Sequence, residues 1–392
     1  MFRNLGRTNL LLLISVFVWS LSVGLWFNQR QLYLGELGAT PEQIGTALAL
    51  EAICAAVVMI PGGFLSDRLG PRRVILGAWS LGVLGVVLMA VAQSWHTAIP
   101  GMILYRCAAA AAPAIMAFAM LSIPDRSLPG ISERTLSTIW AAWPAAQIAS
   151  PWLGGIIAQN TSIRTTMWIA AAILAIGIGV VLLTKPAKAE SSPLQQRPLS
   201  VFRNRQFLLL TGYFALTTMV LYIGHMLLPS FLQETRGFSL ATIGFLFTVS
   251  YVGAVVLNLI AGRRNPRWSF VGLLVLVWLA YLTLWRTSEV WSATVAMFML
   301  GAIPATWIVT NACIVQVVGD RDQGRAFGFF QSLAHAGPAL AAWMAGQLYG
   351  MTPGHALPLV AALVGIPVML ALWFVPGLGS SVAAPPSAKN PG

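Results

Sequence analysis

The sequence predicts an all-α integral membrane protein with twelve transmembrane helices in two pseudo-symmetric six-helix bundles. The composition, the spacing of the apolar segments and a weak internal repeat predict this fold class. Of the 392 residues, 57% are hydrophobic and only 9% are charged, with a mean hydropathy of +0.77. A soluble domain carries about 25% charged residues. The composition therefore excludes a soluble enzyme of two or three domains.

The apolar segments are long enough to cross a bilayer, which takes about 20 residues per helix. We expect spans at residues 9–34, 42–62, 74–93, 97–122, 135–158, 164–184, 206–232, 240–261, 268–285, 291–317, 325–349 and 356–375. The longest polar interruption divides them six and six. The predicted domains are an N-terminal bundle, a cytoplasmic linker, a C-terminal bundle and a disordered cytoplasmic tail: 1–184, 185–205, 206–376 and 377–392.

Basic residues gather on one side of these spans. The side that carries both termini has 18 Lys and Arg, and the other side has four. The positive-inside rule makes the first side cytoplasmic. The net charge of +12 is therefore a topology signal, and we expect a cell (inner or plasma) membrane rather than nucleic acid as the partner.

The cysteines give no sign of a metal site or a disulfide framework. Cys54, Cys107 and Cys313 all lie in apolar segments, and no two are close in the sequence. No Gly-rich phosphate loop with Lys and Ser/Thr is present, so ATP is not expected to drive the protein directly. We expect no metal and no cofactor.

The two halves of the chain resemble each other in three places. The similar segments occur in the same order and at a nearly constant offset: 32–45 with 230–244, 66–73 with 261–268, and 134–155 with 325–346. Two parallel six-helix repeats form a transporter architecture with the substrate site between the halves.

The connection expected between the second and third spans carries the sharpest motif. Its marker residues are Gly63, Asp67, Arg68, Gly70, Arg72 and Arg73. Together with the span count, linker and half-repeat, this motif resembles the signature of the major facilitator superfamily, and the resemblance covers the whole chain. Pro71 occupies a position that is often basic in that signature.

The resemblance implies a cytoplasmic gate that closes when the carrier opens outward. In the family the motif's Asp, here Asp67, faces the start of span eleven, near Gly324 and Arg325. The motif's basic residue pairs with an acid after span four, here Asp125. The second-half copy has Gly262 in place of the acid, so we expect the gate in the first half.

Span five contains a second motif, formed by Ser150, Pro151, Gly154 and Gly155. It resembles the Gly-Pro-x-x-Gly-Gly motif of family members that export substrate in exchange for protons, except that Ser150 replaces the first Gly. Small residues at this spacing also let helices pack backbone to backbone. Both interpretations stay open.

Charged side chains in a membrane core are rare and usually functional. Glu51 is the only one of the 11 acidic residues that falls deep in a span, and Arg106 of span four lies at a similar depth. Arg106 is the nearest candidate partner by depth and Arg30 the second. Glu51 is either a proton switch or half of a permanent ion pair.

Other polar side chains complete the candidate cavity, which spans one, four, seven and ten line in the family. They are Asn28 beside Arg30, His225 of span seven and Asn311 of span ten.

These features predict proton-coupled efflux (antiport) of a small amphipathic compound by alternating access, with the chain acting as a monomer. The alternative is an uptake symporter or facilitator of a small polar solute such as a sugar or an organic anion, which Arg30 and Arg106 would suit. A membrane enzyme would need clustered acids or His ligands within the spans, and the sequence shows none.

Overall fold

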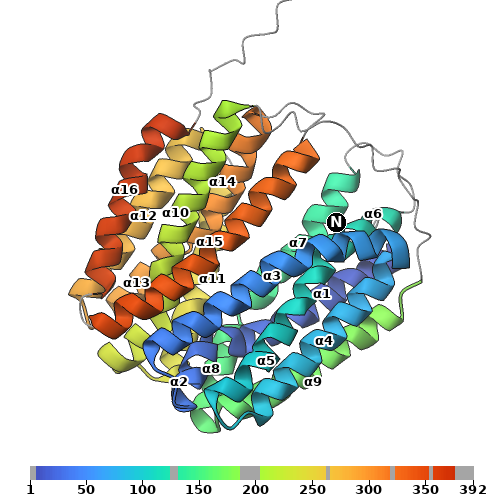
Figure 1. Cartoon of the computed structure of the whole chain (residues 1–392), viewed down its shortest axis with the longest axis horizontal. Coiled ribbons are helices and arrows are strands. Elements are labelled where there is room, and N and C mark those ends of the chain that lie inside the picture. Colours follow the sequence, from blue (N-terminus) through green and yellow to red (C-terminus); the bar gives the residue numbers. More distant parts are fainter. Residues whose placement is uncertain are drawn as a thin grey trace, which may run out of the picture.

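The computed structural model describes residues 6–123, 131–185, 204–261, 265–317, 323–352 and 356–375. Side chains at 60, 132–134, 308, 311–312, 315–316, 323–329, 331–332 and 334–335 are outside that description. The described residues form helices and connections, with no strand among them. Figure 1 shows two groups of helices that converge at the end near α2 and α8 and diverge toward the opposite end.

The N-terminal half follows the predicted spans, several of them in two pieces. Its helices are α1 (Gly6–Trp26), the 3₁₀ turn η2 (Phe27–Gln29), α2 (Arg30–Glu36), α3 (Pro41–Leu69), α4 (Pro71–Val91), α5 (Trp95–Arg106), the 3₁₀ turn η3 (Cys107–Ala110), α6 (Ala111–Leu121), α7 (Ile131–Gln147), α8 (Ser150–Asn160) and α9 (Ile163–Leu182).

The C-terminal half repeats this order. Its helices are α10 (Arg205–Ser230), the π-helical turn η5 (Phe231–Thr235), α11 (Leu240–Ala261), α12 (Pro266–Arg286), α13 (Val290–Leu300), α14 (Ala302–Val317), α15 (Gln323–Met351) and α16 (Ala356–Phe374).

Ten helical stretches among the described residues are long and apolar enough to cross a membrane. The predicted span five, here α7 and α8, and span eleven, here α15, are not among these ten. The structure therefore supports ten of the twelve predicted spans by length and composition.

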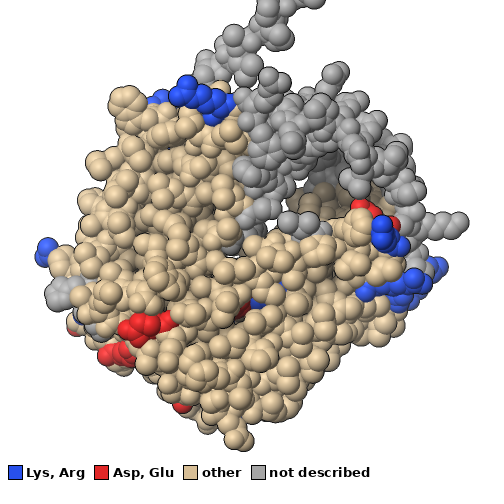
Figure 2. Space-filling model, viewed as in Figure 1, with Lys and Arg blue, Asp and Glu red and all other residues tan. Residues whose placement is uncertain are grey.

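The outer surface is apolar, as a bilayer requires. Large apolar side chains are exposed on several helices, among them Ile176, Leu259 and Trp291. Much of the described surface in Figure 2 carries neither basic nor acidic side chains. Trp291 lies at the start of α13 with 71% of its surface exposed, where an interfacial anchor is expected.

Helix α1 forms side-chain hydrogen bonds with three other helices of the N-terminal half. The Asn9 amide donates to the Ala119 carbonyl of α6 at 3.1 Å, and the Ser22 hydroxyl donates to the Ala170 carbonyl of α9 at 2.7 Å. The Ser20 hydroxyl donates to the Trp143 carbonyl of α7 at 2.8 Å. Buried polar groups need such partners, so these bonds fix the position of α1 against its neighbours.

The segment from Gly63 to Leu69, expected in a connection, is instead helical. Helix α3 continues through it and ends only at Leu69, because Gly70 adopts a φ of +85°. A positive φ favours glycine, and Pro71 then starts α4 at a position that needs no backbone N–H. The predicted connection is therefore reduced to Gly70.

The repeat predicted from residues 66–73 and 261–268 has a structural counterpart. Arg72 donates to the Leu182 carbonyl at the end of α9 at 2.8 Å. Arg267, which follows Pro266 as Arg72 follows Pro71, donates to the Leu372 carbonyl near the end of α16. A cation at a helix C-terminus satisfies carbonyls that lack helical partners. Each half therefore uses the equivalent arginine to hold its last helix.

The halves meet closely at the converging end, where two pairs of helices cross. On α3 and α15, a Cβ atom added to Gly45 would lie 2.7 Å from both the Ala342 carbonyl oxygen and the Gly346 Cα. On α8 and α11, a Cβ added to Gly244 would lie 3.2 Å from the Gly155 Cα. Under the predicted topology this closed end would be extracytoplasmic.

Candidate functional site

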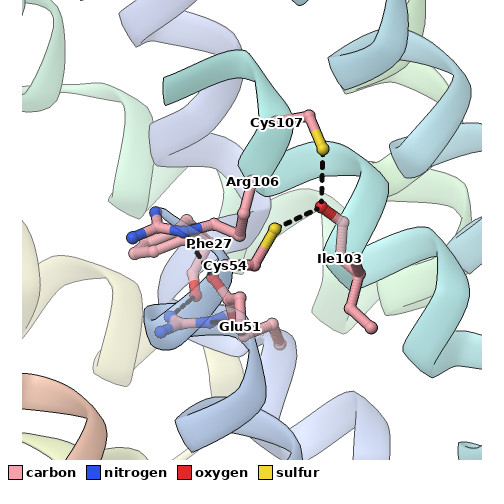
Figure 3. Close-up of polar contacts among 7 residues, drawn as sticks. Phe27, Glu51, Cys54, Ile103, Arg106 and Cys107 are labelled. Atoms are coloured by element: carbon pink, nitrogen blue, oxygen red, sulfur yellow. Dashed lines mark hydrogen bonds and ion pairs between the residues drawn. The ribbon is translucent and has the colours of Figure 1, made fainter. Parts of the chain in front are cut away.

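Three residues of the N-terminal half form a buried ion-pair cluster. Arg30 Nε lies 3.0 Å from Glu51 Oε2, and Arg106 Nε lies 3.4 Å from Glu51 Oε1. Glu51 is only 3% exposed. The three charges come from α2, α3 and the end of α5, and Figure 3 shows Arg106 reaching toward Glu51. The cluster has a net charge of +1, because two guanidinium groups share one carboxylate.

Helix breaks place the two arginines. Arg30 follows the 3₁₀ turn η2, and Arg106 precedes the 3₁₀ turn η3. Short 3₁₀ stretches within a helix often mark functional hinges. The sequence ranked Arg106 as the first partner of Glu51, but Arg30 is the nearer, because the turn at Phe27 brings α2 toward α3.

Phe27 completes the cluster. Its ring lies 3.7 Å from the Arg30 guanidinium carbon and 5.9 Å from that of Arg106, and Arg30 also donates to the Phe27 carbonyl at 2.6 Å. A cation over an aromatic face is stabilised by the ring quadrupole. Arg30 is thus held by a carboxylate, a carbonyl and a ring.

Arg106 is held much less firmly. Its Nε contacts Glu51 without forming a hydrogen bond, and its side chain is 26% exposed. Among the described residues, no hydrogen-bond acceptor is found for its two terminal NH₂ groups. A guanidinium offers five N–H donors, so Arg106 has donors available for a ligand.

Side chains of the C-terminal half face this cluster. His225 on α10 is close enough to Arg30 to interact with its charge. Tyr222 on the same helix interacts in the same way with the charge of Arg106. Tyr251 on α11 makes a polar contact with the Asn28 side chain. The cluster therefore lies at the interface between the halves, where a transporter of two repeats binds its substrate.

A pocket of about 300 Å³ lies between the halves at the converging end. Gln31, the residue after Arg30, lines it together with Glu36 and Glu234. The Tyr349 hydroxyl donates to Glu234 Oε2 at 3.0 Å, and both residues line this pocket. The converging end is therefore closed by helix crossings but is not filled completely.

Comparisons with known proteins identify the family. The model of the Major Facilitator Superfamily matches residues 8–263 and 226–391. The chain belongs to the major facilitator superfamily. The "Inner membrane transport protein YajR" of Escherichia coli K12 is 23% identical over 369 residues, which cover 90% of this chain and 78% of that protein.

A second relative and two solved structures agree with this assignment. A Deinococcus radiodurans protein provisionally named a sugar efflux transporter is 26% identical over 221 residues, covering 54% of this chain and 56% of that protein. A mutant form of the nucleoside transporter NupG superposes with a TM-score of 0.83 at 14% identity, covering 94% of this chain and all of that one. A bacterial homologue of the human lysosomal transporter Spinster, inward-facing and occupied, superposes with a TM-score of 0.75 at 13% identity, covering 93% and 96%. At these identities the structures share the fold alone.

The motif predicted to form the gate lies at the diverging end. Asp67 and Arg73 are exposed, and Arg68 stacks on Phe64 with 4.2 Å from the guanidinium carbon to the ring centre. Within the described residues, the Asp67 carboxylate has no ion pair or hydrogen bond. Asp125 lies outside the described residues, as does the side chain of Arg325, and the surroundings of Gly324 are not described either. The predicted gate contacts stay predictions.

The motif of span five lies at the converging end and packs both halves together. Ser150 starts α8 after a two-residue break, is fully buried and donates to the Ala146 carbonyl at 2.9 Å. Gly154 lies against the backbone of Leu25 on α1, and Gly155 lies against that of Leu240 on α11. Packing accounts for these glycines without reference to the direction of transport.

Sequence reasoning placed some site residues and missed others. It named Glu51, Arg106, Arg30, Asn28 and His225, which the structure places at or facing the cluster. The side chain of Asn311 is outside the described residues. Reasoning from the sequence missed Phe27 and Tyr251. The three-residue spacing of Phe27 and Arg30 was an available signal, whereas none linked Tyr251 to Asn28.

Proposed function

We propose that this chain is a proton-coupled secondary transporter that takes up a small anionic or oxygen-rich polar solute, bound at Arg106 beside Glu51. The supporting observation is the weakly held Arg106 guanidinium, which is partly exposed and approaches Glu51 only to 3.4 Å. The facing Tyr222 and His225 of the C-terminal half suit a solute with hydrogen-bonding groups.

The net charge of the cluster predicts whether the solute and the proton move in the same direction or in exchange. With Glu51 ionised the empty cluster carries +1, and with Glu51 protonated it would carry +2. Uncompensated buried charge is strongly unfavourable, so a second net positive charge in the empty cluster is costly. A bound anion lowers the net charge by one in both cases and offsets that cost. Anion and proton then favour each other's binding, as reciprocal coupling requires, and this arrangement is typical of cotransport.

The location of the cluster limits how the ion pair between Glu51 and Arg106 can be broken during transport. Arg30, Glu51 and Arg106 all belong to the N-terminal half, so movement of one half against the other does not by itself separate them. The pair between Glu51 and Arg106 is instead broken locally, by a solute that takes over the Arg106 donors. Closure of Tyr222 and His225 over the solute then links occupancy to the position of the C-terminal half.

Transport in proteoliposomes with an imposed pH gradient tests the proposal. We expect one class among monocarboxylates, phosphate esters, sugars and nucleosides to accumulate when the outside is acidic, with acidification of the lumen. Arg106→Gln should abolish this uptake, whereas Arg286→Gln, on an exposed arginine at the end of α12, should not. Transport without any proton movement would overturn the proposal.

Export by proton antiport is the second candidate. The partial motif at Ser150–Gly155 favours it, as does the efflux named for the Deinococcus radiodurans relative. The same experiment separates the candidates, because addition of an antiported substrate to the lumen drives protons inward and lowers substrate content. If cells that make the protein retain less substrate than cells that lack it, export replaces uptake.

A further inference from the structure

Two cysteines that are far apart in the sequence meet beside the ion-pair cluster. Cys54 lies on α3 and Cys107 is the first residue of η3. Both thiols donate to the Ile103 carbonyl oxygen at 3.5 Å, as Figure 3 shows. The two sulfur atoms are therefore at most twice that distance apart, and the two side chains also contact each other.

The side chains of Cys54 and Cys107 are partly exposed, whereas the side chain of the third cysteine is not. Cys54 and Cys107 are both half-buried, whereas Cys313 on α14 is completely buried. A soft ion can therefore approach two thiols without unfolding the helices. Because both thiols point toward the Ile103 carbonyl, two sulfur ligands are available at one place. A lone cysteine would offer only one ligand.

Charged side chains of opposite sign flank the two thiols. Cys107 directly follows Arg106, and Cys54 lies one helical turn after Glu51 on α3. The adjacent cluster of Arg30, Glu51 and Arg106 carries a net charge of +1. The thiolate is the form that binds metals, so an ion bound here displaces the two thiol protons.

We propose that Cys54 and Cys107 form a two-coordinate binding site for a soft, thiophilic metal ion of the class of Cu(I), Ag(I) or Hg(II). Thiolate ligands select such ions over hard cations. On binding, each thiol releases one proton to solvent and each sulfur forms one bond to the metal, with no change of oxidation state. A monovalent ion with two thiolates carries −1, which the +1 of the neighbouring cluster offsets.

The bound ion would join α3 to η3 next to Glu51 and Arg106. Local separation of Glu51 and Arg106 would then be restrained. Metal binding itself does not depend on the proposed transport function, so the test measures binding directly.

Titration of the purified, detergent-solubilised Cys313→Ser protein with Hg(II) tests the site, using the ultraviolet sulfur-to-mercury absorption and metal retained against a competing monothiol. We expect one Hg(II) per chain. Cys54→Ser and Cys107→Ser, each made in that background, should lose retention by at least tenfold. Serine keeps a hydroxyl that can donate to the Ile103 carbonyl, so both variants preserve the local packing.

Two results would overturn the proposal. One is the binding of two Hg(II) ions per chain in the Cys313→Ser protein, because the cysteines would then act independently. The other is unchanged retention in either single variant. The stoichiometry of the Cys313→Ser protein decides the question even if a further variant does not fold.

Discussion

Gly45 on α3 and Gly346 on α15 lie backbone against backbone, so that a Cβ added to either would come within 2.8 Å of the other's Cα. A related, looser contact joins Gly244 on α11 to Gly155 on α8, where a Cβ added to Gly244 would lie 3.2 Å from the Gly155 Cα. The internal repeat pairs Gly45 with Gly244 and Gly346 with Gly155. The two crossings that close the converging end are therefore copies of one interaction, related by the pseudo-symmetry of the halves.

Gly45→Ala should weaken closure at the converging end. The added methyl group would collide with the Ala342 carbonyl and with Gly346, and such overpacking costs roughly 1–3 kcal/mol. Because the contact exists only while this end is closed, conformers open at this end should become more populated. A Ser230→Cys reporter in the pocket, in a chain without native cysteines, should react faster with a membrane-impermeant maleimide.

Gly365→Ala on α16 is the matched control, because no atom lies within 4 Å of a Cβ added there. Its labelling rate should equal that of the parent. If Gly45→Ala and Gly365→Ala label at the same rate, the glycine crossing does not hold this end closed.

Glu51→Gln should separate coupling from transport. The variant is expected to lose accumulation driven by a pH gradient but to keep exchange of substrate down its own gradient, because the protonatable group is gone while Arg106 remains. Both activities are measured in the same proteoliposomes. Glu289→Gln, an exposed acid before α13, should keep both.

The same substitution should lower stability. Removing one partner from a buried ion cluster costs roughly 3–5 kcal/mol, here because Arg30 and Arg106 lose their shared carboxylate. A double variant that adds Arg106→Gln should recover part of this loss in thermal unfolding. If accumulation persists in Glu51→Gln, Glu51 is a structural ion-pair residue and not a proton switch.

Asp67→Asn should reduce transport strongly while it leaves the folded protein unchanged. Asp67 is exposed in this conformation, and exposed substitutions usually change stability by less than about 0.5 kcal/mol. Its predicted partners matter only when the diverging end closes. Initial transport rates at matched expression check this, with Asp67→Glu as the charge-preserving control. Normal rates in Asp67→Asn would remove the gate function from this residue.

Arg72→Gln and Arg267→Gln should destabilise the protein by similar amounts. Each arginine donates to a carbonyl at the end of its half's last helix, and a hydrogen bond from a charged group contributes about 1–2 kcal/mol at a partly exposed site. Thermal unfolding of the detergent-solubilised protein should show two nearly additive losses, since the sites lie in different halves.

Arg73→Gln controls for the loss of one positive charge, because Arg73 is exposed next to Arg72. It should unfold at the parent's temperature. A loss in Arg73→Gln as large as that in Arg72→Gln would point to overall charge rather than to the carbonyl contact.

Much of the candidate site was readable from helix geometry. A rise of about 1.5 Å per residue placed Glu51 and Arg106 at similar depth, which made Arg106 the first candidate partner of Glu51. The break at η2 was not readable, since no proline or glycine marks residues 27–29. That break decided that Arg30 lies nearer to Glu51 than Arg106 does.

By itself the sequence predicted the membrane-spanning fold and the two-half organisation, because these follow from local composition and periodicity. The family followed from the resemblance of the motif at Gly63–Arg73 to a known signature. Only the tertiary structure decided which distant residues meet. Cys54 and Cys107 converge on Ile103, and Tyr251 meets Asn28, because the rotation of each helix about its axis selects the side chains that face a neighbour. That rotation is set by packing between helices, such as the glycine crossings, and no local pattern encodes it.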